Sequence, residues 1–541
     1  MKMGSLHGHR SIPATALLAV VLAALGLRLW RIDAPPLDFP ADRQITTAIL
    51  IEAWSGGRPL DGFKQPGWDA ADNVRLLMPE APILPGLAAA TARLFDLDRY
   101  EAFTAARLWT VVFSVLSLLL IFDLGRRWMG AHAGLFAAGA FGILPASVYW
   151  GRAVIPDVPM TTFMLAALCA ADRAVERLAG RALAASGTDG GNGADGRNGM
   201  KASGGDARLG RGAWGWLGLA ALLVGLAVLA KIYGALIAVV IWTLPSRFES
   251  RRWGWRFYAL WTGGLALAAW APASIYYDLP FRGIASRLSE MASETNRALT
   301  LDGHHTPYGM AWMAVFINRL ELALTPAGLL LGLAGQAALI ASRRALVLWT
   351  WLLYALAFGY LLIQANTYWM YLLLPPACLC MGAAAEAFWR RIAQWSPGRW
   401  RRIGVGAVSV AAVVGALGVS PSCDKVLKSY YCVDNATLRA GEFVRRHTTE
   451  GSRGAAWGGV PFDLLWASGR TGLSVPRDPR QRVYGEKTEG AFLDTLSVNR
   501  TFDQFNWDWM AVSRPAGFAG WDELFDRYPC MASDAGVALF A

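Results

Sequence analysis

The chain has 541 residues, of which 55% are hydrophobic and only 17% are charged, and its mean hydropathy is +0.32. Soluble domains carry about a quarter charged residues, so this composition excludes a soluble enzyme and a disordered protein. The net charge of +11 does not indicate binding to nucleic acid, because the basic residues lie between apolar runs rather than on a folded soluble face.

Eleven apolar runs predict membrane-spanning helices, since a span needs about 20 mostly apolar residues. The first run ends at Arg28 and Arg31 without a small-residue cleavage site, so a span is expected there rather than a cleaved signal peptide. Lys231 interrupts the pair of runs around 214–246. The predicted fold class is a polytopic α-helical membrane protein with spans at 12–30, 103–124, 131–150, 158–174, 214–230, 232–246, 257–275, 322–341, 345–363, 368–389 and 403–420.

The lysine and arginine residues predict the orientation of these spans. If the N-terminus, with Lys2 and Arg10, is cytoplasmic, every connection assigned to the inner side is basic, as cytoplasmic loops usually are. An odd number of spans then places the C-terminus outside. The inner segment 182–212 is rich in Gly and polar residues and is expected to be a flexible linker.

The predicted domains are a transmembrane catalytic domain over 1–420, with long outer loops at 31–102 and 276–321, and a periplasmic α/β domain over 421–541. About 120 residues are enough for an independent core. The tail shows an amphipathic helical pattern at 435–447, short strand-like runs at 454–457, 509–513 and 536–540, and a last helix at 521–528.

The first polar cluster follows the first span, on the side where the long loops are expected. Pro40 suits a helix start, and residues 42–54 predict a short amphipathic helix with Asp38 and Asp42 at its N-terminus. One of these residues can cap the helix, which stabilises it by about 1 kcal/mol. The other interpretation is a carboxylate base within reach of an acceptor hydroxyl or amine.

Two further clusters combine opposite charges near the outer ends of spans. Arg152 and Asp157 can pair with each other, or Arg152 can hold a phosphate by two hydrogen bonds while Asp157 orients a sugar or an arginine. Lys231 lies at the turn between two short spans, where it can extend into the lipid headgroups or act as a point charge on a lipid-linked phosphate.

Aromatic residues open the tenth predicted span. Tyr368 and Tyr371 can line a sugar pocket, or Tyr368 and its neighbour Trp369 can be ordinary aromatic residues of the membrane interface. Glu80, between two prolines of the first outer loop, is a weaker candidate for the same site.

These clusters, in this order, resemble the integral-membrane glycosyltransferases of the GT-C superfamily, and most closely the protein O-mannosyltransferase and lipid A aminoarabinose transferase group. The resemblance spans residues 12 to about 390. It depends on an acidic residue that starts a surface helix after span one, Arg-x-x-x-x-Asp after span three, a lysine at a span junction, and the run Tyr-x-x-Tyr-Leu-Leu-Leu-Pro at 368–375.

The resemblance implies roles for these residues. The family's base is an Asp of the first outer loop, often in an Asp-Glu pair that this chain lacks, so Asp38 and Asp42 both remain candidates. A bacterial subgroup carries Asp-Phe-His-Pro-x-Arg-Gln, which would match Asp38, Arg43 and Gln44 and place the latter two at the substrate. By the same resemblance, Arg152 and Lys231 would contact the donor phosphate, and Asp157 would support the site.

The implied reaction moves a sugar from a polyprenyl-phosphate donor to a glycan, lipid or protein acceptor on the periplasmic face of a bacterial inner membrane, with inversion at the anomeric carbon. The motifs lack the paired acids of a metal site, so no metal ligand is predicted, and a need for a divalent cation is left open. The alternative from another class is a transporter or flippase of lipid-linked sugars, although the halves show no repeat and the charges lie at one face.

Overall fold

A computed structural model describes the chain at residues 14–38, 40–58, 63–64, 80–187, 211–247, 255–276, 310–340, 344–362, 367–395, 415–417, 421–431, 435–458, 463–476, 508–513, 530–534 and 537–540. The chain forms two compact units from interleaved segments. The first, here called the helical unit, takes residues 1–30, 111–151 and 156–424. The second, called the mixed unit, takes 31–110, 152–155 and 425–541.

Within the described ranges, five helical stretches are long and apolar enough to cross a membrane. They coincide with five of the predicted runs, so the prediction of a helical membrane protein is confirmed, while the number of spans remains a prediction. The stretches are Arg99–Met129 (α5), Asp157–Ala179 in α8 (Asp157–Gly187), Gly212–Ala230 in α9 (Arg211–Ala230), Phe316–Leu339 in α13 (Met310–Leu339), and Met370–Ile392, which covers most of η5 (Thr367–Leu373) and α15 (Leu374–Trp395).

Other helices occupy most of the remaining predicted runs. They are α1 (Ala14–Leu29), α6 (Ala131–Ile143), α7 (Pro145–Trp150), η3 (Ile232–Leu236), α10 (Ile237–Trp242), η4 (Leu244–Arg247), α11 (Trp255–Tyr276) and α14 (Arg344–Leu362). The predicted run 403–420, the linker 182–212 and the loop 276–321 lie largely outside the described residues.

Small residues let the helices of the helical unit pack closely, as is common between membrane helices. A Cβ added to Gly134 of α6 would lie 2.6 Å from the backbone oxygen of Phe122 in α5. A Cβ on Gly335 of α13 would lie 1.7 Å from the backbone oxygen of Cys380 in α15. Any larger side chain at these two positions would force the helices apart.

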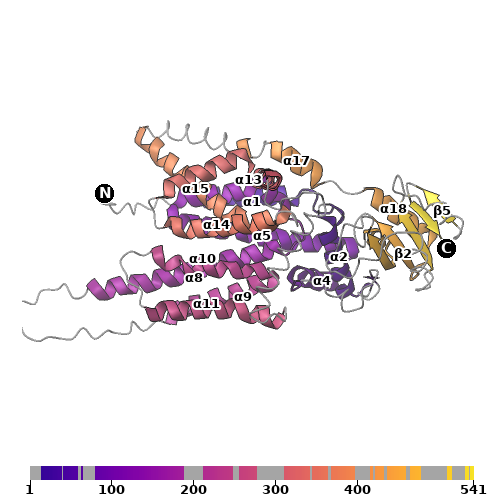
Figure 1. Ribbon diagram of the computed structural model, residues 1–541, viewed down its shortest axis with the longest axis horizontal. Coiled ribbons are helices and arrows are strands. Elements are labelled where there is room, and N and C mark those ends of the chain that lie inside the picture. The colour runs from indigo at the N-terminus through magenta and orange to yellow at the C-terminus, as the bar shows by residue number, and fades with distance from the viewer. Residues whose placement is uncertain are drawn as a thin grey trace, which may run out of the picture. The chain divides into compact units, whose positions relative to one another are not determined.

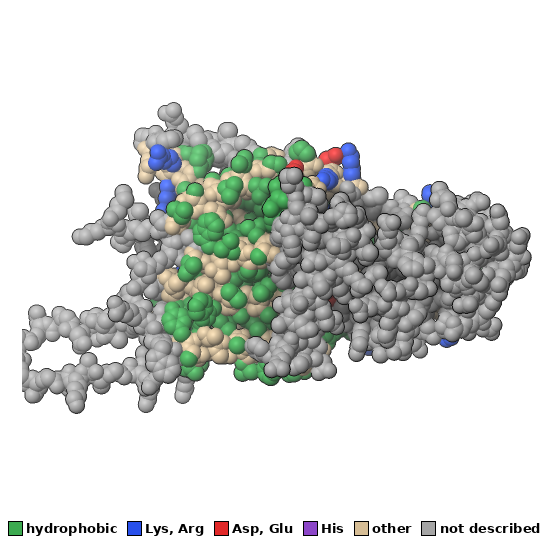
Figure 2. All heavy atoms as spheres, viewed as in Figure 1, with side chains coloured by type: hydrophobic (Ala, Val, Ile, Leu, Met, Phe, Trp, Pro, Cys, Tyr) green, Lys and Arg blue, Asp and Glu red, His purple; other side chains and the backbone are tan. Residues whose placement is uncertain are grey.

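The outer surface of the helical unit is apolar. On the face drawn in Figure 2, hydrophobic side chains cover the described helices over most of their length. Large side chains such as Leu222, Leu260 and Leu330 are 61%, 70% and 69% exposed. In water this surface would be a liability, so it fits a unit surrounded by lipid.

In the described residues of the mixed unit, six strands, of which β2 and β5 are labelled in Figure 1, form a sheet in the order β1-β3-β2-β4-β6-β5. Its strands are β1 (Phe63–Lys64), β2 (Arg453–Gly458), β3 (Thr471–Pro476), β4 (Trp509–Ser513), β5 (Cys530–Asp534) and β6 (Val537–Phe540). Pairing is parallel among β1, β3, β2 and β4 and antiparallel along β4, β6 and β5. Strand β1 belongs to the first loop, so the sheet joins two parts of the chain that are distant in sequence.

Helices α2 (Ala41–Ser55), α4 (Ile83–Phe95), α18 (Asn435–His447) and α19 (Asp463–Ser468) complete the described mixed unit, and α17 (Pro421–Ser429) precedes the tail. The predicted helix at 435–447 and the three predicted strands are confirmed at α18, β2, β4 and β6. The predicted helix at 521–528 lies outside the described residues. The domain boundary at 420 and the periplasmic placement of the tail remain predictions.

Two arginines of the first loop bind the C-terminal carbonyls of α19. Arg99 Nη1 donates to the backbone oxygen of Trp466 at 2.9 Å, and its guanidinium lies 5.2 Å from the indole. Arg58 donates to the backbone oxygen of Leu465 at 3.3 Å. Because the last carbonyls of a helix lack partners within the helix, these contacts fasten the tail to the first loop.

Candidate functional site

Asp38 lies in the short segment between α1 and α2, after two prolines that restrict the backbone. Helix α2 begins at Ala41 with Pro40 as its N-cap, and no side chain caps it. Asp38 therefore does not serve as the cap that the sequence also allowed. Its side chain is instead buried, with only 1% of the residue exposed.

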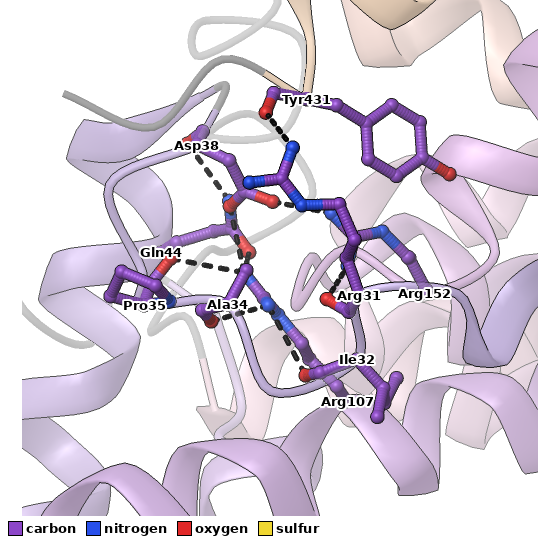
Figure 3. Close-up of polar contacts among 9 residues, drawn as sticks. All are labelled: Arg31, Ile32, Ala34, Pro35, Asp38, Gln44, Arg107, Arg152 and Tyr431. Carbon is purple, nitrogen blue, oxygen red and sulfur yellow. Dashed lines mark hydrogen bonds and ion pairs between the residues drawn. The ribbon is translucent and has the colours of Figure 1, made fainter. Parts of the chain in front are cut away.

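The Asp38 carboxylate binds two guanidinium groups (Figure 3). Oδ1 lies 2.7 Å from Nη2 of Arg107, and Oδ2 lies 2.6 Å from Nη2 of Arg152. All three side chains are at most 2% exposed. Each oxygen of the carboxylate therefore meets a positive group in a buried place, where a charge is costly unless it has a partner.

Gln44 of α2 binds the same carboxylate. Its Nε2 donates to Oδ1 of Asp38 and, at 3.0 Å, to the backbone oxygen of that residue. Its Oε1 accepts from Arg107 Nη2 at 3.3 Å. The first turns of α2 are thereby attached to the Asp38 segment, and both oxygens of the carboxylate have donors.

Arg43 and Glu80, two predicted substrate contacts, bind each other. Nη2 of Arg43 lies 3.2 Å from Oε1 of Glu80, and Nη1 donates to Oε2 at 3.3 Å. Their side chains are 17% and 14% exposed. Arg43 directly precedes the buried Gln44 in the sequence. Unlike Gln44, the Arg43–Glu80 pair is partly exposed to solvent.

Asp42 is on the first turn of α2, but its side chain lies outside the described residues. Over the described parts of the chain, no three His, Cys, Asp or Glu side chains form a group that could hold a metal ion.

In the helical unit, Lys231 pairs with Asp157. Nζ of Lys231 lies 2.8 Å from Oδ2 of Asp157, and their side chains are 3% and 0% exposed. Asp157 is the first residue of α8, where the helix dipole favours an anion. Lys231 lies at the break between α9 and η3, and the rings of Tyr368 and Tyr233 flank its ammonium at 4.7 and 5.6 Å. Of the alternatives weighed from the sequence, this geometry excludes a lysine extended into the headgroups.

The two predicted tyrosines of η5 take part in different contacts. Tyr368 faces Lys231 and packs edge-to-face on Trp150 with ring centroids 5.9 Å apart. The Tyr371 hydroxyl lies 3.4 Å from Oγ of Ser114, and its ring packs against Phe141. Both tyrosines are buried in the helical unit, which is not how residues of an exposed aromatic belt lie.

Arg28 is a buried arginine that the motif reading left without a role. Its guanidinium donates to the backbone oxygens of Phe141 at 3.2 Å and Gly142 at 3.0 Å, and to Oγ of Ser114 at 2.8 Å. These carbonyls lie where α6 ends before Pro145, which has no N–H to donate. Arg28 therefore supplies the Phe141 carbonyl with the donor that the proline lacks, and it also binds the neighbouring carbonyl of Gly142.

Arg107 is the second functional candidate that the motifs missed. Like Arg28, it lies within an apolar run that predicts a span. Ionisable residues in such runs are costly and mark sites by default. The polar motifs of the sequence lie where the loops begin, so they do not include Arg107, and Arg28 enters the sequence analysis only as the basic end of the first run.

Comparison with known proteins agrees with this architecture. The family model described as dolichyl-phosphate-mannose-protein mannosyltransferase matches residues 80–198. No curated protein matches the sequence. Among solved structures, ArnT from Cupriavidus metallidurans bound to undecaprenyl phosphate is 15% identical, with a TM-score of 0.61 over 98% of each chain.

Two further structures show the same likeness. The apo state of the same ArnT is 16% identical with a TM-score of 0.59, covering 97% of this chain and 98% of that one. The apo oligosaccharyltransferase of Archaeoglobus fulgidus is 12% identical with a TM-score of 0.57, covering 92% of this chain and 69% of that one. The predicted resemblance to the GT-C glycosyltransferases is therefore confirmed at the level of the fold.

Proposed function

We propose that this protein transfers a sugar, a hexose or a pentose, from a polyprenyl-phosphate donor to a glycan, lipid or protein acceptor on the periplasmic face of a bacterial inner membrane. The observation that carries the proposal is the buried cluster in which Arg107 and Arg152 share the carboxylate of Asp38. The cluster brings two guanidinium groups together, and guanidinium groups bind phosphates through paired hydrogen bonds.

In the proposed reaction, a carboxylate takes the proton of the acceptor hydroxyl or amine, and the acceptor atom attacks the anomeric carbon. The bond between that carbon and the phosphate oxygen breaks, and its electron pair stays on the departing polyprenyl phosphate. One displacement inverts the anomeric carbon. Fixed cations stabilise the charge that develops on the leaving phosphate.

We assign Arg152 and Lys231 to the donor phosphate, and Arg43, Gln44 and Glu80 to the substrates or to the segment that holds them. Asp157 holds Lys231 in place, as their 2.8 Å contact supports. Tyr368 limits the space around the ammonium, and Tyr371 supports η5 from its contact with Ser114.

The contacts of Asp38 favour one assignment of the base. A base must reach the proton that it removes, whereas Asp38 is buried and both of its oxygens accept from Arg107, Arg152 and Gln44. We therefore assign Asp38 to anchoring the two arginines and assign the base to Asp42, which follows four positions later on the first turn of α2.

The test uses purified full-length protein in nanodiscs, a panel of synthetic polyprenyl-phosphate sugars and an extract of bacterial envelope as the source of acceptor. Formation of free polyprenyl phosphate together with labelled product supports transfer. Arg152→Gln should abolish it, and Arg446→Gln, whose side chain is 72% exposed on α18, should not.

The same preparation separates the transferase from the alternative of a flippase. In sealed vesicles, a flippase moves the intact donor across the bilayer without forming polyprenyl phosphate. Donor translocation with no cleavage for any sugar of the panel would overturn the proposed reaction.

A further inference from the structure

Tyr431 connects the start of the tail with the Asp38 cluster. It follows α17, it is 4% exposed, and its ring lies against the guanidinium of Arg152 with 4.4 Å between the ring centroid and Cζ (Figure 3). This distance is within the range of a cation–π contact. The tail thus covers one face of an arginine that belongs to a different segment of the mixed unit.

Two hydrogen bonds to backbone oxygens link Tyr431, Arg31 and Arg152 in a closed cycle of contacts. Arg31 donates from Nη1 to the backbone oxygen of Tyr431 at 3.2 Å, although the two residues are 400 positions apart in sequence. Arg152 in turn donates from Nη1 to the backbone oxygen of Arg31. The ring of Tyr431 returns to Arg152. Three segments of the chain therefore meet around one guanidinium.

These contacts determine the orientation of the Arg152 guanidinium. Its Nη2 points to Asp38, its Nη1 points to Arg31, and Tyr431 covers its face. The two hydrogen bonds hold the guanidinium at its terminal nitrogens, and the ring of Tyr431 adds a packing contact that further restricts rotation of the Arg152 side chain.

We infer that Tyr431 is a positioning residue for Arg152, through which the tail completes the cation site of the donor phosphate. The inference rests on the proposed function, because it assigns to Arg152 the phosphate of that reaction. Tyr431 itself need not touch either substrate. Without its ring, the guanidinium would keep its charge but lose the orientation that a two-point phosphate contact requires.

The size of the effect follows from the contact. A cation–π contact between desolvated groups contributes about 2 kcal/mol, which corresponds to roughly a thirty-fold change in rate or affinity. Tyr431→Leu should therefore lower kcat/KM for the donor by roughly ten- to thirty-fold and leave the KM for the acceptor unchanged. Tyr431→Phe and Tyr431→Trp keep an aromatic face and should retain most of the activity.

The decisive experiment varies the ring without changing its shape much. Full-length protein carries phenylalanine, 4-fluorophenylalanine or 3,4,5-trifluorophenylalanine at position 431, introduced by codon suppression, because fluorine withdraws electrons and weakens the cation–π contact. Donor kcat/KM, acceptor KM and Tm are measured for each. The matched control is the same series at Tyr100, which lies 4.8 Å from the guanidinium of Arg99 in the same unit.

A stepwise loss of donor kcat/KM across the series at 431, with no loss at 100, supports the positioning role. Equal activity across the series at 431, or a fall in Tm that accounts for the whole loss of activity, overturns it. Wild-type protein that cleaves no donor would overturn the proposed function instead. If the wild-type protein is inactive, only the Tm values of the three proteins with phenylalanine analogues at position 431 are compared. Equal Tm values would then overturn the cation–π contact between Tyr431 and Arg152.

Discussion

The pair of Lys231 and Asp157 allows a structural role to be separated from a role in donor binding. We expect Lys231→Met to destabilise the protein, because it leaves the Asp157 carboxylate buried at 0% exposure without the ammonium 2.8 Å away. Removing one partner of a buried ion pair costs about 3–5 kcal/mol, whereas replacing both by apolar residues is often neutral. Asp157→Leu should have a similar effect to Lys231→Met.

The double variant Lys231→Met/Asp157→Leu should recover most of this loss. The double variant still lacks the acidic side chain at the first residue of α8. That side chain stabilises the helix by about 0.3–1 kcal/mol through its interaction with the helix dipole. Each single variant should therefore lower Tm by roughly 3 to 7 °C, and the double variant by about 1 °C. Scans at one heating rate in the same detergent make these values comparable.

Activity should not recover with stability. If Lys231 contacts the donor phosphate, the double variant loses a charge-assisted hydrogen bond of about 1.5–3 kcal/mol, or roughly 10- to 100-fold in donor kcat/KM. A stable double variant with wild-type kcat/KM would show that the pair only holds the helices together. Single variants with an unchanged Tm would refute the reasoning about the buried pair.

Three further substitutions test the remaining contacts. Asp38→Asn should lower both Tm and activity, because Arg107 and Arg152 lose their counter-charge. Asp42→Asn should abolish transfer with little change in Tm. If the two variants showed the opposite pattern in Tm and activity, the assignment of the base would be reversed. Arg28→Lys should lower Tm, because one ammonium cannot bind both carbonyls at the end of α6, and each buried carbonyl left without a donor costs about 1–3 kcal/mol. The control is Arg126→Lys, which should leave Tm unchanged because the side chain of Arg126 is half exposed. Gly234→Ala should reduce both Tm and donor binding, because a Cβ there would lie 2.3 Å from the backbone oxygen of Ala227 and displace the turn that carries Lys231; an unchanged Tm and donor KM would contradict this.

Composition and periodicity were sufficient to predict the general architecture. The apolar runs are long and distinct, so five of them could be placed on helices that are able to cross a membrane. The tail helix at 435–447 was predicted at its observed bounds because its apolar residues recur with a helical period. Strand β1 was not predicted, since two residues carry no periodic signal and the partner strand β3 is distant in sequence.

The candidate site was predicted in its residue types but not in its pairing. Arg152 and Asp157 are five positions apart and suggested each other as partners, yet Arg152 binds Asp38 and Asp157 binds Lys231. Which of these charged side chains meet is decided by tertiary packing, and their spacing in the sequence does not reveal it. Whether Asp42 acts as the base, and whether the site lies on the periplasmic face, remain predictions.

Strand β1 has a consequence for how the protein is made. Phe63 pairs with Gly472. Strand β1 is therefore synthesised about 400 residues before the strand with which it pairs. Two strand residues form no stable structure by themselves. A ribosome that stops before residue 471 would release a product in which this edge of the sheet cannot assemble, so β1 finds its place only after synthesis has passed β3.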